Sequence, residues 1–153
     1  MLAKFAGRAY GSPVNWYDWL LFLHVTAAFV TVAATALYVA IYLAVRRFSA
    51  ATPVRRLAPL AAVLWGIGGL SVLGFGIWLA IYVDAYQVWD GWVLAAIVLW
   101  VVASAVGGRI GRGYRRMPAD AASDDSRALM MHVVLVLSVL ALLVDMIYKP
   151  GAG

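Results

Sequence analysis

The sequence predicts an all-α integral membrane protein, a four-helix bundle made of four transmembrane helices. Its 153 residues are 65% hydrophobic and only 12% charged, whereas a soluble domain is about 45–50% apolar and about 25% charged. Four apolar stretches, at about 17–45, 57–83, 92–108 and 127–148, are continuous and do not alternate with polar residues. This pattern is typical of helices and not of a strand barrel. We therefore expect residues 1–153 to form a single membrane domain.

The first stretch, 17–45, exceeds the roughly 20 residues that a helix needs to cross a bilayer. Small and polar residues recur along it at alternating intervals of four and three: His24, Ala28, Thr31, Thr35, Tyr38 and Tyr42. This spacing places them on one stripe of a helix. Because the other faces of this helix carry Leu, Phe, Val and Ile, the stripe is expected to face the other helices.

The other three stretches also carry small or polar faces that favour close helix packing. The stretch 57–83 has a seam of small residues, Ala62, Gly66, Gly69 and Gly76. The stretch 92–108 is short for a span and offers Trp100, Ser104 and Gly107 or Gly108 on one side. In the stretch 127–148, Ser138 and Asp145 are seven residues apart and share a face.

The charges predict the orientation. Nine of the twelve basic residues lie within or beside the segments 46–56 and 109–126. The positive-inside rule assigns both segments to the cytoplasm, so both termini face outward. Every acidic residue is Asp and most bases are Arg, which is typical of a GC-rich bacterial gene. We therefore expect a multi-pass protein of the bacterial cytoplasmic (inner) membrane. Nucleic-acid binding is not expected, because no aromatic residues are interleaved with the basic ones in a groove.

Aromatic residues cluster where the helices should meet the outer interface, the position that suits an amphipathic ring. They are Trp16, Tyr17, Trp19, Tyr82, Tyr86, Trp89, Trp92 and Tyr148. Asp90, just before the third stretch, can cap that helix. These residues predict an aromatic belt and need no ligand to explain them.

The candidates for chemistry are the ionisable residues inside the spans: His24, His132 and Asp145. Such residues are costly in a bilayer and are functional candidates by default. Lys149, four residues after Asp145, can instead pair with it. The chain has no cysteine, which excludes a thiolate metal site and a cysteine nucleophile.

Two short runs resemble a known family. The run Trp19–Val25, which contains His24, looks like the opening helix of copper-resistance-D-like membrane proteins, and the run Asp145–Gly151 is similar to the ending of small integral membrane proteins in that group. The resemblance implies a helical bundle with a histidine near the start of its first helix. Some relatives are tied to copper uptake, and some heme-binding relatives to porphyrin oxidation. The Met-rich and Cys-rich motifs of copper transport are missing here.

The two histidines are predicted to lie at different depths in the membrane. In the predicted topology His24 lies in the outer half and His132 in the inner half, ~20 Å apart along the bundle. One heme iron therefore cannot take both as axial ligands. His24 is level with Asp145 and Met146, so His24 and Met146 can hold heme iron, or His24 and Asp145 a metal ion. A His24–Asp145 hydrogen bond without a cofactor is an equal alternative.

The first functional hypothesis is a membrane protein that holds heme b or a metal ion at His24, with His132 as a second cofactor-binding candidate, in a redox or metal-handling role. The alternative is a non-catalytic accessory subunit of a larger, respiratory-type membrane complex, or of a homo-oligomer. No complete set of catalytic residues predicts an enzyme. A transporter or channel would need an oligomer, because four spans are few for a pore.

Overall fold

The computed structural model describes residues 15–47, 54, 56–82, 89–116 and 126–148. It contains the helices α1 (Trp16–Arg47), α3 (Ala58–Tyr82), α4 (Gly91–Arg116) and α5 (Ser126–Tyr148). Each of these helices is long and apolar enough to cross a membrane. The prediction of four helices long and apolar enough to span a membrane is therefore confirmed, and the described residues outside them form no strand. The expectations for Tyr86, Lys149 and most of the two arginine-rich connections fall outside the described residues.

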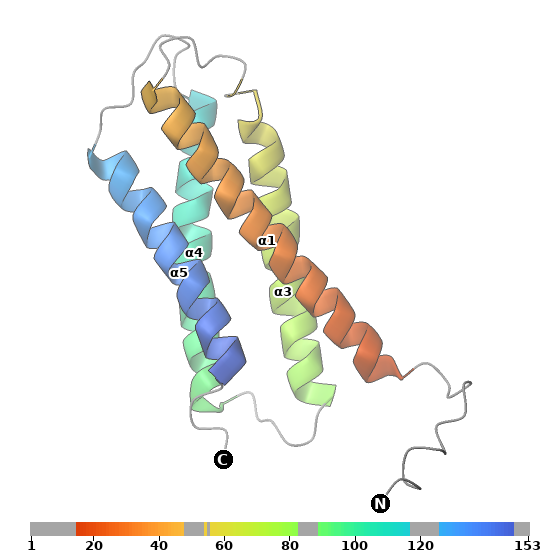
Figure 1. Ribbon diagram of the computed structural model, residues 1–153. Coiled ribbons are helices and arrows are strands. Elements are labelled where there is room, and N and C mark those ends of the chain that lie inside the picture. Colours follow the sequence, from red (N-terminus) through yellow and green to blue (C-terminus); the bar gives the residue numbers. More distant parts are fainter. Residues whose placement is uncertain (1–14, 48–53, 55, 83–88, 117–125, 149–153) are drawn as a thin grey trace, which may run out of the picture.

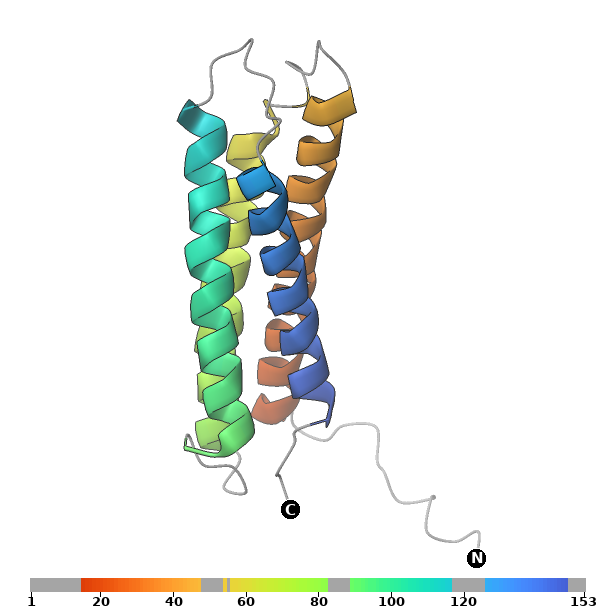
Figure 2. The ribbon, with the colours of Figure 1, turned by 90° about the vertical axis from the view of Figure 1, so that its left-hand side faces the viewer.

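The helices form an elongated bundle in which neighbours in the sequence run in opposite directions (Figure 1). α1 packs along α3, α3 against α4 and α4 against α5, while α1 and α5 make the weakest of these four contacts. α1 and α4 end where α3 and α5 begin. We call this the arginine end, because Arg46, Arg47, Arg56, Arg115, Arg116 and Arg127 lie there. The opposite end is the aromatic end. Figure 2 shows the same bundle from the side.

The stripe of α1 faces inward as predicted. Tyr38, Tyr42 and Thr35 are buried, and His24 and Thr31 are half-buried. The two threonine hydroxyls donate to backbone carbonyls four residues earlier, at 3.0 and 2.9 Å. Neither threonine hydroxyl therefore needs a partner on another helix, and this part of the stripe can pack closely.

Glycines of α3 let this helix approach α1 and α4. A β-carbon on Gly68 would lie 2.8 Å from the Thr31 hydroxyl oxygen and 3.0 Å from the Thr31 backbone nitrogen. The carbonyl of Gly69 accepts a hydrogen bond from the Trp100 indole at 2.9 Å. The predicted seam is wrong at Gly66, which is exposed with nothing within 4 Å of an added β-carbon. The packed face instead runs through Ala61, Gly68, Gly69 and Gly76.

α4 begins as expected but ends later than expected. The carbonyl of Asp90 accepts the first helical hydrogen bond, from Leu94 at 3.0 Å, so Asp90 occupies the N-cap position. The helix continues to Arg116 and not to 108, so residues 109–116 are helix and not loop. Arginines in a last turn complement the helix dipole and keep their charge in water. The apolar stretch therefore ends before the helix does.

The outer surface of the bundle is apolar along its middle. Phe29, Leu70, Val98 and Leu137 are all exposed, which is the arrangement expected of side chains that face lipid. At the aromatic end the exposed rings are those of Trp16, Trp19, Tyr82, Trp89 and Tyr148. Trp92 departs from the predicted belt, because it is only 6% exposed and belongs to the core.

Candidate functional site

His24 is held against α3. Its Nδ1 lies 3.1 Å from the carbonyl oxygen of Val72. Because a carbonyl only accepts, Nδ1 carries the proton of the neutral ring and donates it. Nε2 then keeps its lone pair, and no residue in the described part of the chain hydrogen-bonds to it. A histidine oriented by a carbonyl through one nitrogen, with the other nitrogen open, is the usual state of a metal-ligating imidazole.

The position of His24 depends on a glycine. A β-carbon on Gly76 would lie 3.0 Å from His24 Cε1 and 3.3 Å from Nδ1. The imidazole therefore occupies space that any larger residue would fill. One turn earlier, Val72 supplies the accepting carbonyl. The surface of α3 thus both makes room for the ring and fixes its rotation.

Gly76→Ala is expected to displace the His24 imidazole and to weaken its hydrogen bond to Val72. The expected loss is about 1 kcal/mol in the free energy of unfolding, the usual contribution of one such bond. The measurement is reversible unfolding in mixed detergent micelles. The matched control is Gly74→Ala on the same helix, where an added β-carbon meets nothing within 4 Å. Equal stability of the two variants would contradict the prediction.

Both ring nitrogens of His132 form hydrogen bonds inside the bundle. The ring is only 5% exposed. Its Nδ1 lies 2.7 Å from the carbonyl oxygen of Ala128, and its Nε2 lies 3.1 Å from the Tyr114 hydroxyl. In the neutral ring Nδ1 carries the proton and donates a hydrogen bond to this carbonyl. Nε2 therefore accepts a hydrogen bond from the Tyr114 hydroxyl. Both nitrogens are occupied, and His132 has no lone pair left for a cofactor or metal ion.

An aromatic cluster surrounds His132 at the arginine end. Its ring stacks on Tyr42 with centroids 4.5 Å apart. Tyr114 stacks on Tyr38 at 6.3 Å, and Tyr38 lies 6.5 Å from Trp65. The cluster joins side chains from all four helices. It is therefore a packed cluster of aromatic side chains with a hydrogen bond at its centre.

Sequence reasoning missed the partner of His132. Tyr114 was expected in a loop, because arginines interrupt the apolar stretch before it. The structure places it on α4, and it is buried. The available signal was on α1, where Tyr38 and Tyr42 share the inward stripe one turn apart. Two inward tyrosines near a helix end indicate a polar cluster at that level.

Asp145 and Met146, the expected partners of His24, lie near the C-terminal end of α5. Asp145 is 8% exposed, and its Oδ2 has no hydrogen-bond partner among the residues that the structure describes. No hydrogen bond joins Asp145 to His24, although both lie in the described part of the chain. The physical reason is the tilt of α1, whose N-terminal half diverges from α5 (Figure 1). His24 bonds to α3 instead, so the expected His24–Asp145 hydrogen bond is not formed.

A metal site made of protein ligands alone is not supported within the described residues. No group of three His, Cys, Asp or Glu side chains gathers there. His24 and His132 contact different helices and different partners, so they do not form a pair either.

No family model, curated protein or solved structure matches this chain. Among its ionisable side chains, His24 has the ring nitrogen that is open to a ligand.

Proposed function

We propose that this chain is a small multi-pass protein of the bacterial cytoplasmic membrane that holds heme b through His24, in a redox or metal-handling role. The observation that carries the proposal is the His24–Val72 hydrogen bond of 3.1 Å. It fixes the ring and leaves Nε2 as the single imidazole nitrogen in the two histidines that can bind iron. The resemblance of Trp19–Val25 to copper-resistance-D-like proteins is part of this proposal.

Heme fits the residues better than a bare metal ion does. A metal ion needs several protein ligands, and the described residues offer no group of three. A porphyrin brings four nitrogens of its own, so one axial histidine is enough to attach it. When bound, the heme would supply one-electron redox chemistry. The chain itself would contribute the Nε2 ligand, the Val72 carbonyl that orients it, and the space left by Gly76.

The test is the absorption spectrum of the protein purified in detergent from cells supplied with heme precursor. We expect a Soret band in the wild type and its loss in His24→Ala, because the only open imidazole nitrogen is removed. The matched control, His132→Gln, should keep the band, since His132 is engaged by Tyr114 and Ala128. A wild type without a Soret band, or a His24→Ala variant that keeps it, would refute the heme proposal.

The proposal includes an orientation with both termini outside the cytoplasm. It is supported by the charges at the two ends. The arginine end carries no acidic residue in its described helices, whereas Asp18, Asp90 and Asp145 all lie towards the aromatic end. By the positive-inside rule the arginine end faces the cytoplasm.

Cysteine labelling tests this orientation cleanly, because the native chain has no cysteine. We expect Ala121→Cys, between α4 and α5, to react with a membrane-impermeant maleimide only after the cells are opened. Lys4→Cys, on the other side, should react in intact cells. Labelling of Ala121→Cys in intact cells would reverse the orientation.

A non-catalytic accessory subunit of a larger membrane complex is the second candidate. It is favoured by the internal hydrogen bonds of four polar side chains of the bundle, those of His132, Thr31, Thr35 and Trp100. Such a core serves packing and needs no ligand. Co-purification with respiratory subunits, without a Soret band, would favour this second function.

A further inference from the structure

Tyr114 and His132 form a hydrogen-bonded pair of a phenol and a base inside the bundle. The Tyr114 hydroxyl oxygen lies 3.1 Å from His132 Nε2, and both side chains are buried. Transfer of a proton to a base requires a separation of about 2.6–3.2 Å between the two heavy atoms. The pair therefore holds the phenol proton within reach of a base, at a site that solvent hardly contacts.

The hydrogen bonds of His132 suit the ring both before and after it takes up a proton. A neutral phenol is a much weaker acid than an imidazolium, so at rest the proton stays on Tyr114. An imidazolium at His132 would donate from Nε2 to the Tyr114 oxygen and from Nδ1 to the Ala128 carbonyl. Both acceptors are already in place. No side chain therefore has to move when the proton is transferred.

Aromatic rings connect this pair to α1 and α3. Tyr38 stacks on Tyr114 with the ring centroids 6.3 Å apart, and the centroid of Trp65 lies 6.5 Å from that of Tyr38. In a chain without cysteine, tyrosine and tryptophan are the side chains that lose one electron most readily. Rings at these separations exchange electrons by tunnelling. An electron can therefore leave Tyr114 through Tyr38 and Trp65.

Two tyrosines of the cluster differ in what their hydroxyls meet. The hydroxyl of Tyr42 accepts a hydrogen bond from Arg46 Nη1 at 3.3 Å, and a guanidinium cannot take up a proton. The hydroxyl of Tyr114 instead meets a base, His132. Because loss of an electron makes a phenol strongly acidic, a tyrosine is oxidised more easily when a base accepts its proton. The structure therefore favours Tyr114 over Tyr42 as the residue that is oxidised.

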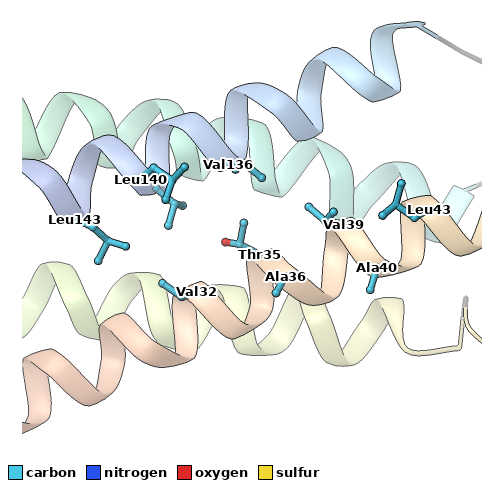
Figure 3. Close-up of a pocket in the computed structure, with 10 residues that line it drawn as sticks. Val32, Thr35, Ala36, Val39, Ala40, Leu43, Val136, Leu140 and Leu143 are labelled. Atoms are coloured by element: carbon cyan, nitrogen blue, oxygen red, sulfur yellow. The ribbon is translucent and has the colours of Figure 1, made fainter.

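The groove beside this cluster is aliphatic. It has a volume of about 370 Å³ and lies between α1 and α5 (Figure 3). Its lining consists of Val, Ala and Leu side chains together with Thr35, whose hydroxyl is bonded to a backbone carbonyl. On α1 the lining includes Val39 and Leu43, which follow Tyr38 and Tyr42 in the sequence. These lining side chains hold neither a base nor an oxidisable ring, so they do not compete for the proton or the electron.

We propose that Tyr114 is a redox-active tyrosine and that His132 is its proton acceptor. One electron passes from the Tyr114 ring to a one-electron oxidant of high potential, the class to which ruthenium(III) polypyridyl complexes belong. The O–H bond of Tyr114 breaks, and the proton forms an N–H bond at His132 Nε2. The product is a neutral tyrosyl radical that accepts a hydrogen bond from an imidazolium. Return of one electron restores the phenol and the neutral ring. The proposal is independent of any cofactor at His24.

Electron paramagnetic resonance tests this proposal on the full-length protein in detergent micelles. The protein is frozen after flash oxidation by tris(bipyridine)ruthenium with persulfate. Radicals at exposed tyrosines, such as Tyr82 and Tyr148, couple to one another and disappear, whereas a buried radical cannot meet a second one. We expect the wild type to keep a tyrosyl signal after this decay, coupled to a hydrogen that exchanges in D₂O. Tyr114→Phe should lose the persistent signal. The matched control Tyr42→Phe removes a hydroxyl from the same cluster and should keep it.

His132→Gln separates proton transfer from hydrogen bonding. Glutamine can accept the hydrogen bond of Tyr114, but it cannot hold the proton. Oxidation of Tyr114 should then be about a hundredfold slower, the lower end of what a positioned base contributes, and the persistent signal should be lost. A wild type without this signal would overturn the proposal, as would its survival in Tyr114→Phe or in His132→Gln. Loss of the signal in Tyr42→Phe alone would assign the radical to Tyr42 and also overturn it.

Discussion

Gly107→Ala is expected to lower the free energy of unfolding by about 2–3 kcal/mol, the cost of overpacking a well-filled core. A β-carbon at this position would lie 2.5, 2.6 and 2.9 Å from three ring atoms of Trp65. The ring cannot move away easily, because Trp65 is 8% exposed and its other neighbour is the buried Tyr38. The added methyl group must therefore push α4 away from α3.

Reversible unfolding in mixed micelles, followed by tryptophan fluorescence, measures this effect. Gly113→Ala is the matched control, because it lies on the same helix and an added β-carbon meets nothing within 4 Å. Alanine favours a helix over glycine by up to about 1 kcal/mol, so this control should be neutral or slightly stabilising. If Gly107→Ala were as stable as Gly113→Ala, the close packing of α3 against α4 would be wrong.

His132→Ala is expected to cost about 3 kcal/mol, because it combines two penalties. The buried Tyr114 hydroxyl loses its acceptor, which costs about 1–3 kcal/mol. The ring of Tyr42 also loses the surface on which it stacks at 4.5 Å, and the space left behind adds a cavity cost. The same unfolding assay measures the loss.

A double-mutant cycle separates these two contributions. Tyr114→Phe removes only the hydroxyl and should cost about 1 kcal/mol. In the His132→Ala background the same change should cost nothing or stabilise, since the hydroxyl has already lost its acceptor. Additive effects of the two substitutions would show that the 3.1 Å contact contributes no energy.

The sequence was sufficient to predict the four spans and the inward face of α1. Both depend on hydrophobicity and on helical spacing, which are local properties of the chain. The stripe from His24 to Tyr42 is an example, since the spacing alone places these residues on one face. The stripe was expected to face the other helices, and the structure places its member His24 against α3, beside Val72 and Gly76.

The end of α4 and the tilt of α1 could not be predicted from hydropathy and helical spacing. The C-terminal turns of α4 are rich in arginine. The hydropathy of the sequence therefore did not indicate that the helix continues to Arg116 and buries Tyr114. The tilt of α1 relative to α5 is a property of the packed bundle and leaves no periodic trace. With straight, parallel helix axes, His24 was expected at the level of Asp145 and beside it. In the structure the N-terminal half of α1 tilts away from α5 (Figure 1).

The contact of α1 with α3 is the most extensive in the bundle, and its contact with α5 is the weakest. α3 is also tied to α4, through the Trp100–Gly69 hydrogen bond and the packing of Gly107 on Trp65. α1 meets α5 at the arginine end, where the rings of Tyr42 and His132 stack, and the two helices diverge towards the other end (Figure 1). His24 lies ~27 Å from that stack along α1. Because α3 holds the imidazole through Val72, the orientation of the ring does not depend on how far α5 lies from α1 at that level.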